Sequence, residues 1–137
     1  MSSGWERIRL RVETGENLKA DTMNNNRTIS CHVLDTALGK AVANLPLTLY
    51  RQLNDGQWQE LSQHSTNSDG RVGQLVDFKD FEQGIYKLKF HVQNYFDNCK
   101  VSSFYPFVEI VIRCERGQHY HVPLLLSPFG YTTYRGT

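Results

Sequence analysis

Residues 118–128 read QHYHVPLLLSP, and this stretch decides the fold. Successive side chains of a β-strand point to opposite faces, so the pattern predicts one apolar face and a second face that carries both His119 and His121. The apolar face consists of Tyr120, Val122, Leu124 and Leu126. A Ser-Pro turn follows, and residues 129–137 then bring tyrosines and an arginine. We therefore expect the closing residues to fold back over the face that the two histidines share.

From Thr28 onward the sequence is typical of short strands separated by turns. Alternating apolar and polar residues predict strands at 29–34, 45–50, 58–64, 85–92, 105–114 and 118–126. Asn54-Asp55-Gly56 predicts a hairpin, Ser68-Asp69-Gly70 predicts another turn, and a turn at Gly117 is expected to pair the last two of these strands. Alternation fails at 94–100, where we expect one short helix against a sheet edge. Strands at this spacing predict an all-β sandwich.

Length and composition limit the functions that this chain can have. At 137 residues it forms one domain that can bury a core without metals or disulfides. A formal net charge of +1 predicts no general affinity for nucleic acid or for an anionic membrane surface. Cys31, Cys99 and Cys114 fit neither a disulfide framework nor a spaced zinc motif, so we expect a reducing compartment. No apolar run reaches the length of a signal peptide or a membrane span, which predicts a soluble protein that is not secreted.

The first residues differ from the rest of the chain. Residues 1–27 are mostly polar, and we expect them to form a mobile N-terminal extension ahead of a domain at 28–137. Within the extension, Arg7, Arg9 and Arg11 alternate with apolar residues. This short pattern fits an added strand, a docking segment or part of a targeting signal, and the sequence leaves these alternatives open.

Three histidines and an arginine are the candidates for chemistry. In the predicted strand 29–34, Ser30 and His32 lie on the side opposite the apolar residues. The side chain of His32 is therefore expected to point away from the core, as those of His119 and His121 do. Arg71 directly follows Asp69-Gly70 at a turn tip, where its guanidinium group can reach a carboxylate or an oxyanion. A single histidine in such a position is most often a hydrogen-bonded surface residue, but the group as a whole favours a site. His64 and His91 have no polar companions in the pattern and are interpreted as structural.

Two chemistries suit imidazoles on strands. One is a zinc site, because a His-X-His pair with a third histidine elsewhere is a common zinc arrangement. Against it, the sequence offers no obvious carboxylate ligand near these histidines, and a nearby arginine disfavours a divalent cation. The other is general acid–base catalysis, in which a neutral imidazole takes a proton from water while an arginine offsets developing negative charge, with no cofactor. The sequence contains no Gly-X-Ser-X-Gly nucleophile elbow and no glycine-rich phosphate-binding loop, so a serine nucleophile or a nucleotide site has little support.

Several separated motifs together resemble one known family. They are SCHVLDTALGK at 30–40, SDGR at 68–71, FYPFVEI at 104–110, HYHVPLLLSP at 119–128 and YRGT at 134–137. Their order and spacing resemble those of the transthyretin-related 5-hydroxyisourate hydrolases over residues 29–137. The resemblance implies an eight-stranded antiparallel transthyretin-like sandwich with one short helix. It also implies a homotetramer, built as a dimer of dimers, with active sites in a channel at the dimer–dimer interface.

The resemblance further implies a reaction and a set of site residues. The reaction is the hydrolytic opening of the cyclic amide ring of 5-hydroxyisourate to 2-oxo-4-hydroxy-4-carboxy-5-ureidoimidazoline, between urate oxidation and allantoin, by histidine-activated water without a metal or other cofactor. By analogy His32, Arg71 and His121 are catalytic, with the base and the relay not assigned between the histidines. The implied substrate-binding residues are Tyr134, Thr137 and His119. The family usually ends in Tyr-Arg-Gly-Ser, so Thr137 keeps the hydroxyl and adds a methyl group.

Two other functions remain as alternatives. A transthyretin-like carrier would bind a hormone or another small ligand in the same channel without catalysis, and fold alone does not separate it from an enzyme. The hormone carriers of this superfamily replace the histidines and the arginine and continue past the closing tetrapeptide. A zinc hydrolase built on the three histidines is the third reading. Because the chain ends in Arg-Gly-Thr, no C-terminal peroxisomal address is expected, and we predict a cytoplasmic or peroxisomal protein.

Overall fold

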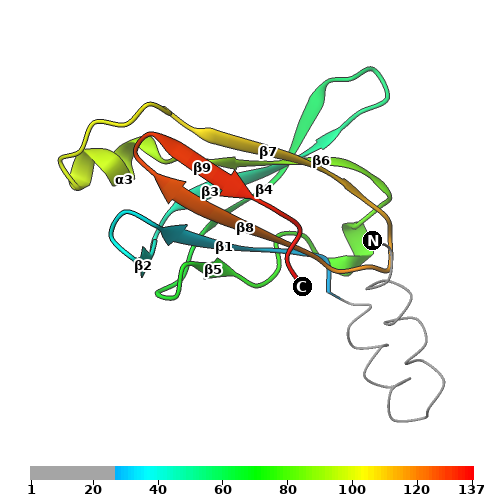
Figure 1. Cartoon of the computed structure of the whole chain (residues 1–137). Coiled ribbons are helices and arrows are strands. Elements are labelled where there is room, and N and C mark those ends of the chain that lie inside the picture. Colours follow the sequence, from blue (N-terminus) through cyan, green and yellow to red (C-terminus); the bar gives the residue numbers. More distant parts are fainter. Residues whose placement is uncertain (1–26) are drawn as a thin grey trace, which may run out of the picture.

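Alternating side chains build two β-sheets that pack face to face. The computed structural model describes residues 27–137, and Figure 1 shows the two sheets as layers with one short helix at an end of the sandwich. The first sheet contains β1 (Ile29–Asp35), β2 (Lys40–Ala41), β5 (Arg71–Val72), β8 (Tyr120–Ser127) and β9 (Gly130–Thr133). Its strand order is β2-β1-β8-β9, with β5 also paired to β1. We call it the histidine sheet.

The second sheet is a four-stranded antiparallel sheet. It contains β3 (Pro46–Gln52), β4 (Trp58–Ser65), β6 (Gly84–Phe90) and β7 (Val108–Cys114) in the order β4-β3-β6-β7. A 3-10 turn, η2 (Phe78–Asp80), precedes β6, and the helix α3 (Gln93–Asn98) follows it. Within residues 27–137 no helix is long and apolar enough to cross a membrane.

The core lies between the two sheets and excludes water almost completely. Leu49 and Leu88 of the second sheet and Val33 and Leu124 of the histidine sheet are fully buried. Phe96 of α3 is also buried, so the helix covers an end of the sandwich. Burial of such apolar side chains is the main favourable contribution to folding. The other face of each sheet is therefore available for polar residues.

Most of the predicted fold is confirmed. The chain is a mostly β sandwich with one short helix, and the hairpin predicted at Asn54-Asp55-Gly56 joins β3 to β4. Gly56 has a φ of 88°, a conformation that glycine adopts without strain. The Leu53 amide donates to the Gln57 carbonyl across this turn at 2.7 Å. Two of the observed strands, β2 and β5, are only two residues long and carry no alternation that a sequence pattern can reveal.

The predicted pairing of 105–114 with 118–126 is wrong. β7 pairs with β6 in the second sheet, whereas β8 pairs with β1 and β9 in the histidine sheet, so the turn at Gly117 carries the chain from one sheet to the other. Each of these strands buries its own apolar row, and the two rows must face each other across the core. The Glu115 amide donates to the Tyr120 hydroxyl at 2.8 Å, which ties the crossing to the start of β8.

The sandwich is not antiparallel throughout. β1 and β8 run parallel over their whole common length, from Ile29 opposite Tyr120 to Asp35 opposite Leu126. A parallel pair needs a long connection, and residues 36–119 lie between these two strands. The expected mobile extension falls on residues 1–26, which lie outside the described residues, and on Arg27.

A buried hydroxyl provides a test of the fold. Thr66 is 2% exposed, and its Oγ1 donates to the Val42 carbonyl at 2.6 Å and accepts from the Leu45 amide at 2.9 Å. Thr66→Val keeps the shape but leaves both backbone groups unpaired, so we expect a loss of about 2–4 kcal/mol in the free energy of unfolding, measured by urea titration. The matched control is Ser65→Ala, which removes a neighbouring exposed hydroxyl and should change stability by less than about 0.5 kcal/mol. Equal effects of the two substitutions would contradict this account.

Candidate active site

The parallel pairing of β1 and β8 gathers polar residues on the outer face of the histidine sheet. Ser30 lies opposite His121, and His32 lies opposite Pro123. On the other side of β1, the short strand β5 places Arg71 opposite His32. Directly opposed residues of a sheet point to the same face, so these side chains share one surface although they come from three separate parts of the chain.

A tight turn positions Arg71. Gly70 has a φ of 78°, and a Cβ at this position would lie 2.5 Å from the Val33 carbonyl oxygen, so only glycine fits. The side-chain oxygen of Asn67 accepts from the amides of Asp69 and Arg71, both at 2.9 Å. This arrangement holds the start of β5 against β1 and leaves the Arg71 side chain exposed.

The same turn determines the tautomer of His32. His32 Nε2 lies 3.0 Å from the carbonyl oxygen of Asp69. A carbonyl can only accept a hydrogen bond, so Nε2 carries a proton and donates it. In the neutral ring Nδ1 is then the nitrogen with a free lone pair.

A serine hydroxyl joins the other two histidines. Ser30 Oγ lies 2.7 Å from His121 Nδ1 and 2.9 Å from His119 Nε2, and Ser30 is 6% exposed. The shared face that the sequence pattern predicts for His119 and His121 is therefore present, because one side chain contacts both rings. His121 keeps only its Nε2 for a further partner.

Both of these imidazoles are held in the neutral form. Burial is the first cause that lowers the pKa of His119, to about 4, followed by the positive charge of Arg27, His121 and Arg135. Burial also lowers the pKa of His121, assisted by Arg71, His32 and Arg27. A neutral imidazole can accept a proton, and the surrounding arginines favour an anionic or electron-rich ligand.

The closing residues fold back over His121, as the sequence predicts. The Gly136 amide donates to the His121 carbonyl at 2.8 Å, and this bridge continues the register of Leu124 with Thr133. Pairing is interrupted opposite Pro123, which has no N–H to donate. A Cβ on Gly136 would lie 2.6 Å from His121 Cδ2, so the tail passes directly over the imidazole.

The remaining predicted site residues lie at the rim of this surface. The register of the tail places Tyr134 opposite Pro123, on the face of His121, but its side chain is 57% exposed. Thr137 is exposed. Arg135 points to the other side, where its guanidinium lies 4.4 Å from the centre of the Tyr120 ring. A single chain therefore brings His32, His119 and His121 close together and leaves Tyr134 and Thr137 open to solvent.

The donor atoms do not converge as a metal site. Among residues 27–137 no group of three or more His, Cys, Asp or Glu side chains is arranged to hold a metal ion. His32 uses Nε2 for a carbonyl, and the facing nitrogens of His119 and His121 are bonded to Ser30. Burial raises the pKa of the Cys31 thiol to about 12, so it is not an activated nucleophile.

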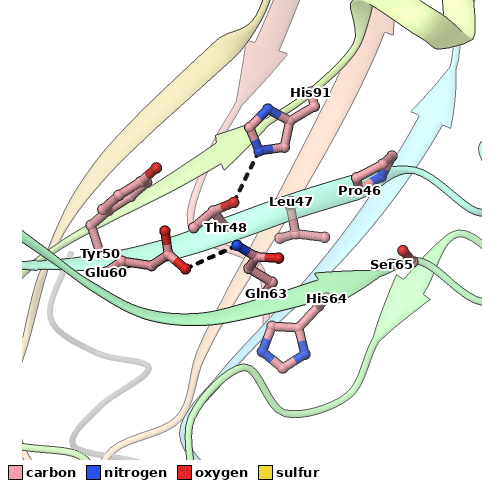
Figure 2. A pocket seen from close by; sticks show the side chains of 9 residues that line it. All are labelled: Pro46, Leu47, Thr48, Tyr50, Glu60, Gln63, His64, Ser65 and His91. Atoms are coloured by element: carbon pink, nitrogen blue, oxygen red, sulfur yellow. Dashed lines mark hydrogen bonds between the residues drawn. The ribbon is translucent and has the colours of Figure 1, made fainter.

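A shallow groove on the second sheet holds the two remaining histidines (Figure 2). His91 Nε2 is bonded to the Thr48 hydroxyl at 2.9 Å. His64 Nε2 lies 2.8 Å from the Leu75 carbonyl oxygen and 3.0 Å from the Ser62 hydroxyl. These bonds support the interpretation of both histidines as structural and place them on the other sheet from His121.

The sequence pattern missed the residues that orient the histidines. Ser30 is two positions before His32 and so had to share its face, but its bonds depend on the pairing with β8. Asn67 carries a signal that could have been used, because asparagine often bonds to backbone amides of a following turn. Arg27 lies next to the first strand, and nothing in its local sequence distinguishes it from the preceding polar residues.

Comparison with known proteins agrees with this architecture. The model of the HIUase/Transthyretin family matches residues 29–136. The chain belongs to the HIUase/Transthyretin family. A probable 5-hydroxyisourate hydrolase of Schizosaccharomyces pombe is 43% identical over 113 residues, which cover 80% of this chain and 90% of that protein.

The similar solved structures include a thyroxine-bound transthyretin and a 5-hydroxyisourate hydrolase. Sea bream transthyretin in complex with thyroxine has a TM-score of 0.76 at 27% identity, covering 80% of this chain and 94% of that one. The 5-hydroxyisourate hydrolase of Klebsiella pneumoniae has a TM-score of 0.71, also at 27% identity, covering 80% of this chain and 99% of that one. The fold of the family therefore supports two kinds of function, and the residues on the histidine sheet must separate them.

The contact between Gly136 and His121 generates a prediction. Gly136→Ala should push the tail or the imidazole aside, because the new methyl group has no room. We expect catalytic efficiency to fall about 10- to 100-fold with little change in stability, as measured by steady-state kinetics and thermal unfolding. Gly130→Ala is the matched control, because the nearest atom to its Cβ is Ser127 Oγ at 3.9 Å. Full activity of Gly136→Ala would contradict a functional role of the tail.

Proposed function

We propose that this chain hydrolyses 5-hydroxyisourate, opening its cyclic amide ring with water to give 2-oxo-4-hydroxy-4-carboxy-5-ureidoimidazoline. The observation that carries the proposal is the pair of neutral imidazoles beside Arg71 and His32 on the outer face of the histidine sheet. This set suits removal of a proton from water next to a developing oxyanion. The S. pombe relative, named as a probable 5-hydroxyisourate hydrolase, supports the same reaction.

His121 is the proposed general base. Its Nδ1 is bonded to Ser30, so Nε2 is the nitrogen that takes the proton as the water oxygen bonds to the ring carbonyl carbon. Arg71 offsets the negative charge that forms on the carbonyl oxygen. The tetrahedral intermediate then collapses, the C–N bond breaks, and the leaving nitrogen takes the proton that His121 Nε2 removed from water. His32 faces the same surface, and its free Nδ1 is the proposed relay that accepts this proton and passes it to the leaving nitrogen.

No metal takes part in this mechanism. Its charge stabilisation comes from Arg71, and its proton transfers use His121 Nε2 and His32 Nδ1, the nitrogens that the hydrogen bonds to Ser30 and Asp69 leave free. Cationic side chains around His121 would also repel a divalent cation.

We propose that His119, Tyr134 and Thr137 bind the substrate, and that a second copy of the chain completes the site. Tyr134 is 57% exposed and so has free surface for a ligand or a partner. Sheet edges at β7 and β9 are unpaired in the single chain. Exposed apolar side chains lie beside these edges, including Phe104 and Phe129, each 72% exposed, and Val111, 53% exposed. Unpaired edges with apolar surroundings favour pairing between copies, which supports a dimer, and two dimers facing through their histidine sheets would enclose the site.

A cytoplasmic or peroxisomal location is part of the proposal. Its support is the cysteine chemistry, because Cys31, Cys99 and Cys114 are all unpaired and two of them are buried. Free thiols of this kind suit a reducing compartment.

The alternative function is a small-ligand carrier. The likeness to thyroxine-bound sea bream transthyretin favours it, since the two folds superpose over most of both chains. The site disfavours it, because a passive aromatic ligand has no use for two imidazoles held neutral beside an arginine. Turnover of 5-hydroxyisourate separates the two functions.

The decisive experiment follows the decay of 5-hydroxyisourate, freshly generated from urate, by ultraviolet absorbance in the presence of a chelator. Wild type should accelerate the decay strongly, and His121→Ala and Arg71→Ala should each lower kcat by roughly 100-fold or more. His91→Ala is the matched control, because it removes a histidine whose contacts lie on the second sheet. Decay at the spontaneous rate by folded wild-type protein would refute the hydrolase and favour the carrier.

The pH dependence of the same assay tests the role of His121. Its pKa lies below the usual 6.5, so the neutral base persists as the solution is acidified. We expect kcat/KM to stay level as pH falls through 6.5 and to decline only at lower pH. A decline centred at or above 6.5 would contradict His121 as the base.

The assembly can be tested separately. Phe104→Lys places a charge on the most exposed apolar surface near the β7 edge and should reduce the mass measured by light scattering from that of a tetramer to that of smaller species. Leu53→Lys is the matched control, because Leu53 is 43% exposed in the β3–β4 hairpin, away from both edges. A monomeric wild type, or equal effects of both substitutions, would contradict the proposed interface.

A further inference from the structure

Ser30 is a buried polar group on the histidine sheet to which the proposed reaction assigns no task. It is 6% exposed, yet its hydroxyl lies within hydrogen-bond distance of two ring nitrogens, His121 Nδ1 and His119 Nε2. A buried hydroxyl between two titratable rings is costly to leave unpaired, so its single proton must be placed consistently with both.

Counting protons leaves two arrangements. A serine hydroxyl has one proton and two lone pairs, so it can donate to only one of the two rings. If it accepted from both rings, its own buried O–H would lack an acceptor, which is costly, so it donates to one ring and accepts from the other. In the first arrangement His121 Nδ1–H donates to Ser30, and Ser30 donates to His119 Nε2. In the second, His119 Nε2–H donates to Ser30, and Ser30 donates to His121 Nδ1. The two arrangements give His121 opposite tautomers.

Only the first arrangement makes His121 useful as a base. With the proton on Nδ1, Nε2 keeps its lone pair and can take a proton from water. The second arrangement puts the proton on Nε2, which blocks that nitrogen. After His121 has accepted a proton, both of its nitrogens carry hydrogen, so Nδ1 must donate to Ser30. The first arrangement therefore serves before and after proton transfer without any reorientation of the hydroxyl.

The charges around the cluster keep both rings neutral, as either arrangement requires. Arg71 and His32 act on His121, Arg27 acts on both rings, and Arg135 acts on His119. Together with burial, these positive groups oppose the addition of a proton to His119, so its ring stays neutral. In the first arrangement its Nε2 can then accept from Ser30. The Arg135 side chain also donates to the His119 carbonyl at 3.3 Å, which helps to hold this residue in place.

We propose that Ser30 is a positioning residue that holds His121 in the tautomer with an unprotonated Nε2, and that His119 is the acceptor at the end of this hydrogen-bonded chain. The proposal deepens the proposed hydrolase function and rests on it for its catalytic consequence. Under this proposal His119 also acts on catalysis, because it accepts the hydrogen bond from Ser30 in addition to binding the substrate.

The first test reads the tautomers directly in the substrate-free protein. Nitrogen-15 NMR of the histidine rings near neutral pH should show wild-type His121 protonated at Nδ1 and His119 unprotonated at Nε2. Ser30→Ala should shift His121 towards the Nε2–H tautomer, and Ser30→Thr, which keeps the hydroxyl, should restore the wild-type signal. This readout requires no turnover, and a wild-type His121 protonated at Nε2 overturns the proposal.

The second test measures the catalytic consequence. Ser30→Ala should lower kcat by roughly 10-fold or more with a much smaller change in KM, and Ser30→Thr should recover most of the loss. Ser62→Ala is the matched control, because Ser62 also bonds a histidine, His64, but on the second sheet. It should change neither kcat nor the His121 signal. If Ser30→Ala fails to fold, His119→Ala gives the same expectation for the His121 tautomer, because the Ser30 hydroxyl then turns towards Nδ1.

The outcomes separate this proposal from the proposed function. Rapid turnover by a wild type whose His121 is protonated at Nε2, or by Ser30→Ala at an unchanged rate, refutes the role of Ser30 and leaves the hydrolase in place. The expected tautomers without turnover of 5-hydroxyisourate refute the hydrolase and leave the hydrogen-bonded arrangement.

Discussion

The parallel pairing of β1 with β8 is the constraint on which the site depends. It sets Ser30 opposite His121, and it places His32 of β1 next to the strand that carries His121 and that begins directly after His119. A shift of one residue in this register would turn the histidines into the core and the apolar row into solvent. Because Val33 and Leu124 are fully buried, the core itself opposes such a shift. The energetics of packing therefore maintain the geometry of the polar face.

The edges of the histidine sheet complete the arrangement through backbone constraints. On one side, the left-handed Gly70 allows β5 to approach β1 closely enough to set Arg71 opposite His32. On the other side, Pro123 interrupts the ladder, and Gly136 lets the tail cross the His121 ring. Both glycines stand where a Cβ would collide with a neighbouring strand. Gly136 thus brings the backbone of the tail against the His121 ring, which limits the motion of the ring.

The sequence allowed prediction of the sandwich, the Asn54-Asp55-Gly56 hairpin and the face shared by His119 and His121, because each depends on local alternation or turn chemistry. It did not allow prediction of the partners of β7 and β8. A glycine turn between two alternating strands has the same local pattern whether the strands pair or cross between sheets. The role of Ser30 was hidden for a related reason, since its two bonds arise only when β1 and β8 meet. Long-range pairing therefore decides what local patterns leave open.

A single chain leaves part of the polar face of the histidine sheet open to water. His119 and His121 are kept neutral by partial burial together with the positive charges around them, yet Arg71 and Tyr134 on the same face remain exposed to water. Water weakens the interaction of an arginine with a developing oxyanion, because screening in a high dielectric is strong. Covering this face with a second histidine sheet would exclude water and strengthen that interaction without moving any residue of the first chain. Assembly would then act on catalysis mainly by lowering the dielectric around Arg71. A variant that fails to assemble should therefore keep the His121 tautomer but hydrolyse 5-hydroxyisourate more slowly.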